Sequence, residues 1–399
     1  MGPRGIPFGR RSFLACLSVA ASMAITRSAW AEDEDEPSGV RGNDGTTDTT
    51  GEPNAPPSHD DVVVEEPGSA GGTTGGSDAL VVPEPNEPGS PPPPPRVVRT
   101  PLTASRVRGV SHDEKGTTLT LELVRAPFPA PGSGHDDPTV VVFVPAYYRL
   151  AKSGRSDVVV HFHGHRTTAE RSMRAHDLRE QLFDSKQNAL LVMPQGPWMT
   201  ADSGIGKLEA PNGFARFLAD VMATLQAKEC KAALARAGTK VGKSVGTVCL
   251  SAHSGGYHAA ASCVKHGGVA VREVWLFDAL YGDEDVFRAW LVDGKAKHER
   301  RKLVSFATGG TTAALSNKLH AALEKAGLRC ARERTEGATS RATFTTSDAV
   351  FVHTAVGHTD VPNQSNGLRD CLYASGLTRH LRTSWFDKKS GSRTIDRRR

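Results

Sequence analysis

Short apolar runs alternate with helical stretches from about residue 101 onward. Each run is almost continuously apolar, as expected for strands that are buried on both faces of a sheet. The runs cover residues 139–144, 158–162, 189–193, 247–250, 274–277, 303–307 and 349–352. Between some of them, residues 214–222 repeat apolar side chains at helical spacing and residues 257–264 are rich in alanine. This alternation predicts an α/β fold with a mostly parallel sheet and helices on both faces.

Residues 117–124 and 139–148 come before the alternation begins. We therefore expect them to form antiparallel strands at one edge of the sheet.

The first 31 residues are organised like an export signal. Arg10 and Arg11 precede an apolar stretch over residues 13–25, and Ala29-Trp30-Ala31 offers small residues for cleavage. The run Arg10-Arg11-Ser12-Phe13-Leu14 resembles the twin-arginine pattern, and an ordinary secretory signal is the alternative. Either signal predicts export, and the twin-arginine pattern predicts a bacterial source, with the periplasm or the exterior as the destination.

Residues 32–100 differ in composition from the rest of the chain. They hold 13 prolines, ten glycines, 15 acidic and 3 basic side chains, and end in the proline run 91–95. Such a segment cannot build a core, so we expect a disordered acidic linker. We expect the folded catalytic domain to span residues 101–390, followed by a basic tail over 391–399.

Length and charge narrow the class of protein. The chain has 399 residues, of which 38% are hydrophobic, so it can bury a large core. Residues 101–399 carry 42 basic and 29 acidic side chains, spread along the chain instead of gathered in one tract. No apolar run is long enough to span a membrane. A nucleic-acid binder and a membrane-spanning protein are therefore not expected, and the oligomeric state stays open.

The most informative segment runs from Val248 to Tyr257, with the sequence VCLSAHSGGY. A buried strand leads into the pattern small, any, Ser254, any, small, and a helix follows. Only small residues at 252 and 256 permit the tight turn that presents the Ser254 hydroxyl at the carboxyl edge of the sheet. The amide of Gly255 would then face a developing oxyanion. A plain tight turn is the alternative to a nucleophile.

A nucleophilic serine needs a base and an orienting acid. Asp278 follows the next buried strand and His358 follows the last one, which gives the chain order Ser254, Asp278, His358 of a known triad arrangement. Asp278 as a helix N-cap or a structural ion-pair partner is the alternative, with Asp283, Asp285 and Asp360 as substitutes for the acid. His353 is predicted to lie mid-strand as a packed core histidine.

The strand 158–162 ends in His163-Gly164-His165, where the amide of His165 or Arg166 would complete an oxyanion hole. With these motifs, residues 155–365 resemble the α/β-hydrolase superfamily. Pro194-Gln195-Gly196 and Gly213-Phe214 are loosely similar to secreted feruloyl-esterase and polyhydroxyalkanoate-depolymerase-like proteins. The sequence departs from the pattern in having Ala252 in place of the first glycine, and in carrying the acid one strand earlier than many members.

His161, His163 and His165 also suggest a metallohydrolase site, although Arg166-Thr167-Thr168 replaces the Asp-His of a metallo-β-lactamase-like pattern. Five cysteines remain after cleavage of the signal, so one or two disulfides are allowed and at least one thiol stays unpaired. Cys249 is expected to be a small core residue.

We therefore predict an exported serine hydrolase, with esters as the expected substrates and no cofactor. The resemblance to a superfamily rich in esterases suggests the substrate class, and peptidase or acyltransferase activity would use the same residues. Trp198, Tyr257 and Tyr281 are candidates for lining an acyl pocket, and the segments 198–212 and 283–301 for its walls or a lid. A non-catalytic binding protein that keeps the fold is the alternative.

Overall fold

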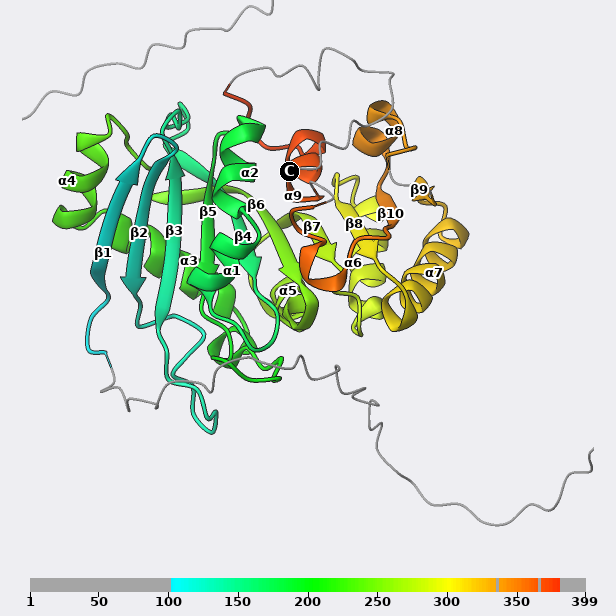
Figure 1. Ribbon diagram of the computed structural model, residues 1–399, viewed down its shortest axis with the longest axis horizontal. Coiled ribbons are helices and arrows are strands. Elements are labelled where there is room, and N and C mark those ends of the chain that lie inside the picture. Colours follow the sequence, from blue (N-terminus) through cyan, green and yellow to red (C-terminus); the bar gives the residue numbers. More distant parts are fainter. Residues whose placement is uncertain (1–101, 335–336, 365–366, 381–399) are drawn as a thin grey trace, which may run out of the picture. The chain divides into compact units, whose positions relative to one another are not determined.

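The computed structural model describes residues 102–334, 337–364 and 367–380, all of which belong to one compact unit. The predicted signal, acidic linker and basic tail lie outside the described residues. The described part is built around one ten-stranded sheet of order β1-β2-β3-β5-β4-β6-β7-β8-β10-β9 (Figure 1).

The strands β4 to β10 are all parallel, and β1, β2 and β3 extend the sheet in antiparallel pairing. Their bounds are β1 (Arg106–Asp113), β2 (Gly116–Glu122), β3 (Thr139–Pro145), β4 (Arg155–Phe162), β5 (Ala189–Pro194), β6 (Ser244–His253), β7 (Val271–Phe277), β8 (Lys302–Ala307), β9 (Cys330–Glu333) and β10 (Ala349–His353). The predicted α/β fold, with a mostly parallel sheet and antiparallel strands at one edge, is confirmed.

Helices cover both faces of the sheet, as predicted. Helices α3 (Gly213–Leu225), α4 (Lys228–Arg236), α5 (Tyr257–His266), α6 (Glu284–Ala296) and α7 (Gly310–Lys325) pack on one face. Helices α1 (Ala169–Ala175), α2 (Leu178–Ser185), α8 (Arg341–Thr346) and α9 (Gly367–Ala374) pack on the other. Along β4, Val158 and Val160 join the first core cluster and Val159 joins the second, which explains why the central strands are apolar at every position.

The strand directions bring many loops to one edge of the sheet. The parallel strands all end there, and β2 ends there too, because β3 runs antiparallel to both β2 and β5. In an open α/β sheet this carboxyl edge is where sites are built.

The two outermost strands, β1 and β9, were not predicted. β1 is largely exposed and polar, and β9 is only four residues long, so neither has the apolar run by which a buried strand is recognised.

None of the five cysteines in the described residues forms a disulfide. The disulfides that an exported chain allowed are therefore absent from this part of the chain. Cys249 is fully buried in β6, as expected. Within the described residues, no helix combines the length and apolar character needed to cross a bilayer.

Candidate active site

Ser254 stands in a tight connection between strand and helix. β6 ends at His253, a single 3₁₀ turn covers Ser254–Gly256, and α5 follows. We call the turn Ser254–Gly256 the elbow. Ser254 has a φ of +50°, in the left-handed region that L-residues rarely adopt. The turn is close-packed: a Cβ on Gly256 would lie 2.5 Å from the Phe162 carbonyl oxygen, and one on Gly164 would lie 2.8 Å from Ser254 Cβ. The steric requirement that the sequence suggested is therefore present.

The side chains of Ser254, His358 and Asp278 form one hydrogen-bonded line. His358 Nε2 lies 2.9 Å from Ser254 Oγ, and His358 Nδ1 lies 2.6 Å from Asp278 Oδ2. The carboxylate accepts from Nδ1–H, so Nε2 carries the lone pair and the Ser254 hydroxyl donates to it. The three residues that the sequence singled out are in contact, in the order that proton transfer requires.

Asp278 is held by more donors than His358 alone. Its Oδ2 also accepts from Thr308 Oγ1 at 2.7 Å, while Oδ1 accepts from the Thr308 amide at 3.0 Å and lies 2.5 Å from Thr312 Oγ1. Burial alone would raise the pKa of Asp278, but the hydrogen bonds from His358, Thr312 and Thr308 outweigh it and lower the pKa to about 2. The carboxylate is therefore ionised throughout the physiological range.

Asp278 directly follows β7, and its backbone is hydrogen-bonded to the end of β8. Its amide donates to the Phe306 carbonyl at 2.9 Å, and its own φ is +44°. The alternative role as a helix N-cap is wrong, because α6 begins at Glu284 and Asp283, not Asp278, occupies its N-cap position. The other substitutes do not hold the base: Asp285 pairs with Arg288, and Asp360 ends the 3₁₀ turn that begins at His358.

The two loops predicted to supply oxyanion donors meet at Gly255. The His165 ring occupies the space of a Gly255 side chain, since a Cβ there would lie 2.1 Å from His165 Nε2. That nitrogen is 2.8 Å from Ser203 Oγ, which ties the ring to the loop after β5. The Arg166 amide donates to the Thr200 carbonyl at 2.9 Å, so of the two amides considered, His165 is the candidate.

The alternating histidines at the end of β4 and in the loop after it have separate hydrogen-bond partners. Both ring nitrogens of His163 are engaged, and burial lowers its pKa to about 4, so the ring is neutral. Within the described residues, no three His, Cys, Asp or Glu side chains are grouped to hold a metal ion. The ring partners are Ser251 for His161, Gly164, Gln195 and Gly196 for His163, and Ser203 for His165.

The prediction for His353 was wrong. It is the last residue of β10 and is exposed, because the strand stops there and turns into the loop that carries His358.

Sequence reasoning missed two buried histidines, His253 and His176, of which His253 packs against His358. His253 Nε2 donates to the His358 carbonyl at 3.0 Å, and its ring packs 5.0 Å from that of His358. His176 packs edge-on against His253 at 4.7 Å. Burial lowers the pKa of His253 well below its usual value, so it is a neutral support for the loop. Its position directly before Ser254 was the available signal.

The three aromatic residues suggested for substrate binding differ in whether they contact His358. The Tyr281 ring lies 6.2 Å from the His358 ring and is 38% exposed, and Tyr257 packs 6.2 Å from Tyr281. Trp198 is half-buried in the loop after β5. Among the described residues, Tyr281 is the one of the three with a ring contact to His358. The segment 283–301 is mostly helix α6, whose Phe287 and Leu291 are buried in the core.

No known family model matches the sequence, and no curated protein is significantly similar to it. Solved structures are similar in fold. The feruloyl esterase module from Clostridium thermocellum has a TM-score of 0.38 at 11% identity, covering 71% of this chain and 93% of its own. An S-formylglutathione hydrolase from Agrobacterium tumefaciens has a TM-score of 0.35 at 12% identity, covering 72% and 100%. Fluorophosphonate-binding serine hydrolase F from Staphylococcus aureus has a TM-score of 0.37 at 9% identity, covering 64% and 95%. These likenesses concern the fold alone.

Proposed function

We propose that this protein is a serine hydrolase that cleaves carboxylic esters through an acyl-enzyme on Ser254. The observation that carries the proposal is the line of hydrogen bonds from Ser254 through His358 to Asp278, on a turn where Ser254 has a positive φ. Backbone strain at a nucleophile is typical of sites in which the fold overrides local preference.

The first half of the reaction transfers the acyl group. As Ser254 Oγ attacks the carbonyl carbon, its proton passes to His358 Nε2, and Asp278 stabilises the imidazolium through Nδ1. The amides of Gly255 and His165 are the proposed donors to the oxyanion. When the intermediate collapses, the bond from carbon to the leaving oxygen breaks and His358 returns the proton to that oxygen.

The second half restores the enzyme. His358 takes a proton from a water that attacks the acyl carbon, and then returns it to Ser254 Oγ as the acid leaves. Every proton exchanged is held at His358 Nε2, so Asp278 stays ionised throughout. Its pKa of about 2 supports this role.

The decisive experiment is labelling of purified protein with a fluorophosphonate, together with turnover of short-chain p-nitrophenyl esters. Labelling and turnover should both disappear in Ser254→Ala. Ser262→Ala is the matched control, because Ser262 is also buried but lies within α5. A folded wild-type protein with neither labelling nor turnover would exclude the proposal and favour a binding function. Chelators should leave turnover unchanged.

We also propose that the protein is exported. The supporting observations are the twin-arginine-like run at Arg10 and Arg11 and the cleavage pattern ending at Ala31. N-terminal sequencing of protein recovered from outside the cytoplasm should begin at Glu32. A mature chain that still starts at Met1 would contradict export through this signal.

A further inference from the structure

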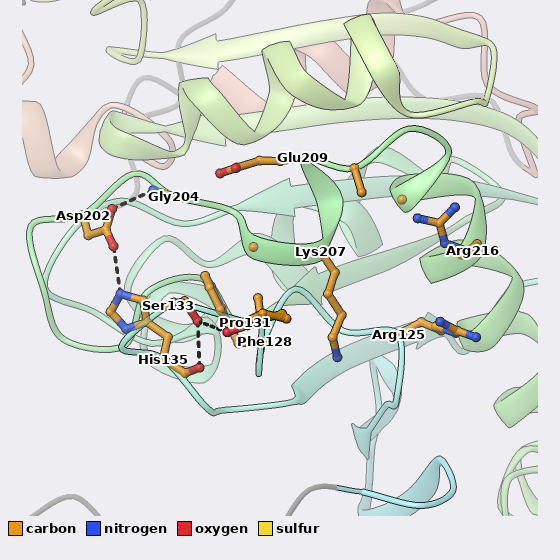
Figure 2. Close-up of a pocket in the computed structure, with 15 residues that line it drawn as sticks. Arg125, Phe128, Pro131, Ser133, His135, Asp202, Gly204, Lys207, Glu209 and Arg216 are labelled. Atoms are coloured by element: carbon orange, nitrogen blue, oxygen red, sulfur yellow. Dashed lines mark hydrogen bonds and ion pairs between the residues drawn. The ribbon is translucent and has the colours of Figure 1, made fainter.

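A cavity of about 490 Å³ lies at the carboxyl edge of the sheet, between the loop after β2 and the loop after β5 (Figure 2). Its walls come from residues 125–135, residues 202–213 and Arg216 in the first turn of α3. Because β2 and β5 both end at this edge, the cavity opens on the same side of the sheet as Ser254.

The cavity adjoins the elbow through one loop. Asp202 lines both this cavity and a smaller one whose walls include Gly164 and Gly255. The next residue, Ser203, holds the His165 ring against Gly255. The two cavities therefore share Asp202 as a wall, and the loop that carries it lies beside both the larger cavity and Gly255.

Three cationic side chains line the cavity: Arg125, Lys207 and Arg216. Within the described part of the chain, none of the three forms an ion pair with a carboxylate. Lys207 Nζ donates to the Val124 carbonyl at 2.8 Å, and Arg216 Nη1 donates to the Pro211 carbonyl at 2.8 Å. Both bonds fix the side chains without neutralising them.

The Lys207 ammonium group is partly buried and lies near a second positive charge. Burial and then the neighbouring Arg125 charge lower the pKa of Lys207, while Asp220 opposes them. An anion between Lys207 and Arg125 would relieve this repulsion, so the arrangement favours one.

The two acids in the lining are occupied by the loop itself. Asp202 accepts from His135 Nε2 at 2.8 Å and from the Gly204 amide at 2.8 Å. Glu209 accepts from the Ile205 amide at 3.0 Å. In Figure 2, Asp202 lies at one end of the cavity and Arg125 and Arg216 lie at the other. At the basic end, the carboxylate of Asp220, which lies outside the lining, is itself held by Ser105 Oγ at 2.8 Å and by the Arg125 amide at 2.9 Å.

We propose that this cavity binds an anionic group, such as a carboxylate, sulfate or phosphate, that the substrate carries at a distance from its ester bond. The inference rests on the proposed function, because it assigns the specificity of the same site. Arg125, Lys207 and Arg216 hold the anion, and Phe128 and Pro131 provide apolar walls for the chain that links it to the ester.

The test compares ester pairs that differ only in charge. p-Nitrophenyl esters of dicarboxylic acids of increasing length place a carboxylate on the acyl side, and phenyl acetates with a carboxyalkyl group place it on the leaving side. Each is measured beside its neutral primary amide. At low salt we expect a preference in kcat/KM of about tenfold for the carboxylate at the chain length that reaches the cavity.

The preference should fall several-fold in Arg125→Gln and in Lys207→Gln, and should vanish in the double variant. Lys231→Gln removes an exposed cation of α4 outside the cavity and should leave the ratio unchanged. Inorganic phosphate should inhibit turnover of the carboxylate ester more than that of the amide. Equal rates for the two members of every pair would overturn the inference, as would a preference that survives in the double variant.

A binding measurement separates failure of the inference from failure of the proposed function. Calorimetry with the free dicarboxylate on Ser254→Ala needs no turnover. Binding that is lost when Arg125→Gln and Lys207→Gln are added supports the cavity even in a protein without esterase activity. Absence of binding at low salt, in a protein that does hydrolyse neutral esters, overturns the inference and leaves the proposed function standing.

Discussion

Thr312 Oγ1 lies 2.5 Å from Asp278 Oδ1, on the carboxylate oxygen opposite the one that accepts from His358. This hydroxyl belongs to α7, the helix that follows β8. In the sheet, β8 lies two strands away from β6, which carries the elbow. Asp278 is thus positioned in part by a hydroxyl from α7, a helix that carries neither the nucleophile nor the base.

Replacing Thr312 by valine keeps the shape of the side chain and removes this donor. We expect a raised pKa for Asp278 and a loss of about 1 to 2 kcal/mol in transition-state stabilisation, or about tenfold in kcat/KM. Steady-state kinetics with a neutral p-nitrophenyl ester would measure it. Ser316→Ala removes a buried hydroxyl from the same helix that bonds to Ser305 instead, and should leave the rate near wild type. Equal losses in both variants would argue against a specific role.

His253 is expected to position the base. His253→Phe keeps a ring against His176 but removes the donor to the His358 carbonyl, so kcat should fall by about tenfold with little change in KM. His253→Gln retains an N–H donor and should recover part of the rate. A change in thermal stability with kcat unaltered would reduce His253 to a packing residue.

The strain at Ser254 gives a trade-off between activity and stability. Ser254→Gly removes the nucleophile but adopts a positive φ without penalty, whereas Ser254→Ala keeps a Cβ in the same conformation. We expect Ser254→Gly to be more stable than Ser254→Ala by about 1 kcal/mol in the free energy of unfolding. Urea denaturation of the two inactive variants would test this, and equal midpoints would contradict it.

A side chain at Gly256 should disturb the close packing of the elbow and destabilise the fold. Gly256→Ala would place a methyl group 2.5 Å from the backbone oxygen of Phe162, which cannot move without displacing β4. We expect a destabilisation of about 2 kcal/mol or more together with loss of activity. Gly134→Ala is the control, because a Cβ there meets open space. It should unfold at the wild-type urea concentration.

Buried neutral histidines make the fold sensitive to mild acid. Burial lowers the pKa of His163 and of His176 to about 4, below the ordinary value of 6.5. The folded state therefore binds fewer protons than the unfolded chain between these values. Its stability is complete above pH 6.5 and is lost as the pH falls toward 4, by about 2 kcal/mol per histidine at pH 5. Asp278 contributes only in a lower window, between pH 3.8 and 2.

Urea melts at a series of pH values would measure this slope. His176→Gln should unfold with a shallower dependence between pH 6.5 and 4 than the wild type. His112→Gln, at an exposed position on β1, should keep the wild-type slope. An unchanged slope in His176→Gln would contradict the assignment.

The residues that the sequence predicted best are those whose signal is local. A strand buried on both faces is apolar at every position, so β4 to β8 were recognisable, and the small residues at 252 and 256 mark a tight turn whatever surrounds it. Thr308 and Thr312 could not be found in this way, because their contact with Asp278 exists only once β7 and β8 lie side by side. His353 was misplaced for a related reason: whether a residue is buried depends on where its strand stops, and the apolar pattern fixes that point only loosely.

The cysteines of the described residues lie outside any disulfide, and this affects how the fold responds to oxidants and reductants. Four of the five are buried, and burial raises the pKa of Cys230, Cys249 and Cys263, so these thiols resist oxidation. The described fold contains no bond that a reducing compartment would break. The described fold therefore does not depend on an oxidised pair of cysteines, and a reductant should leave its urea midpoint unchanged.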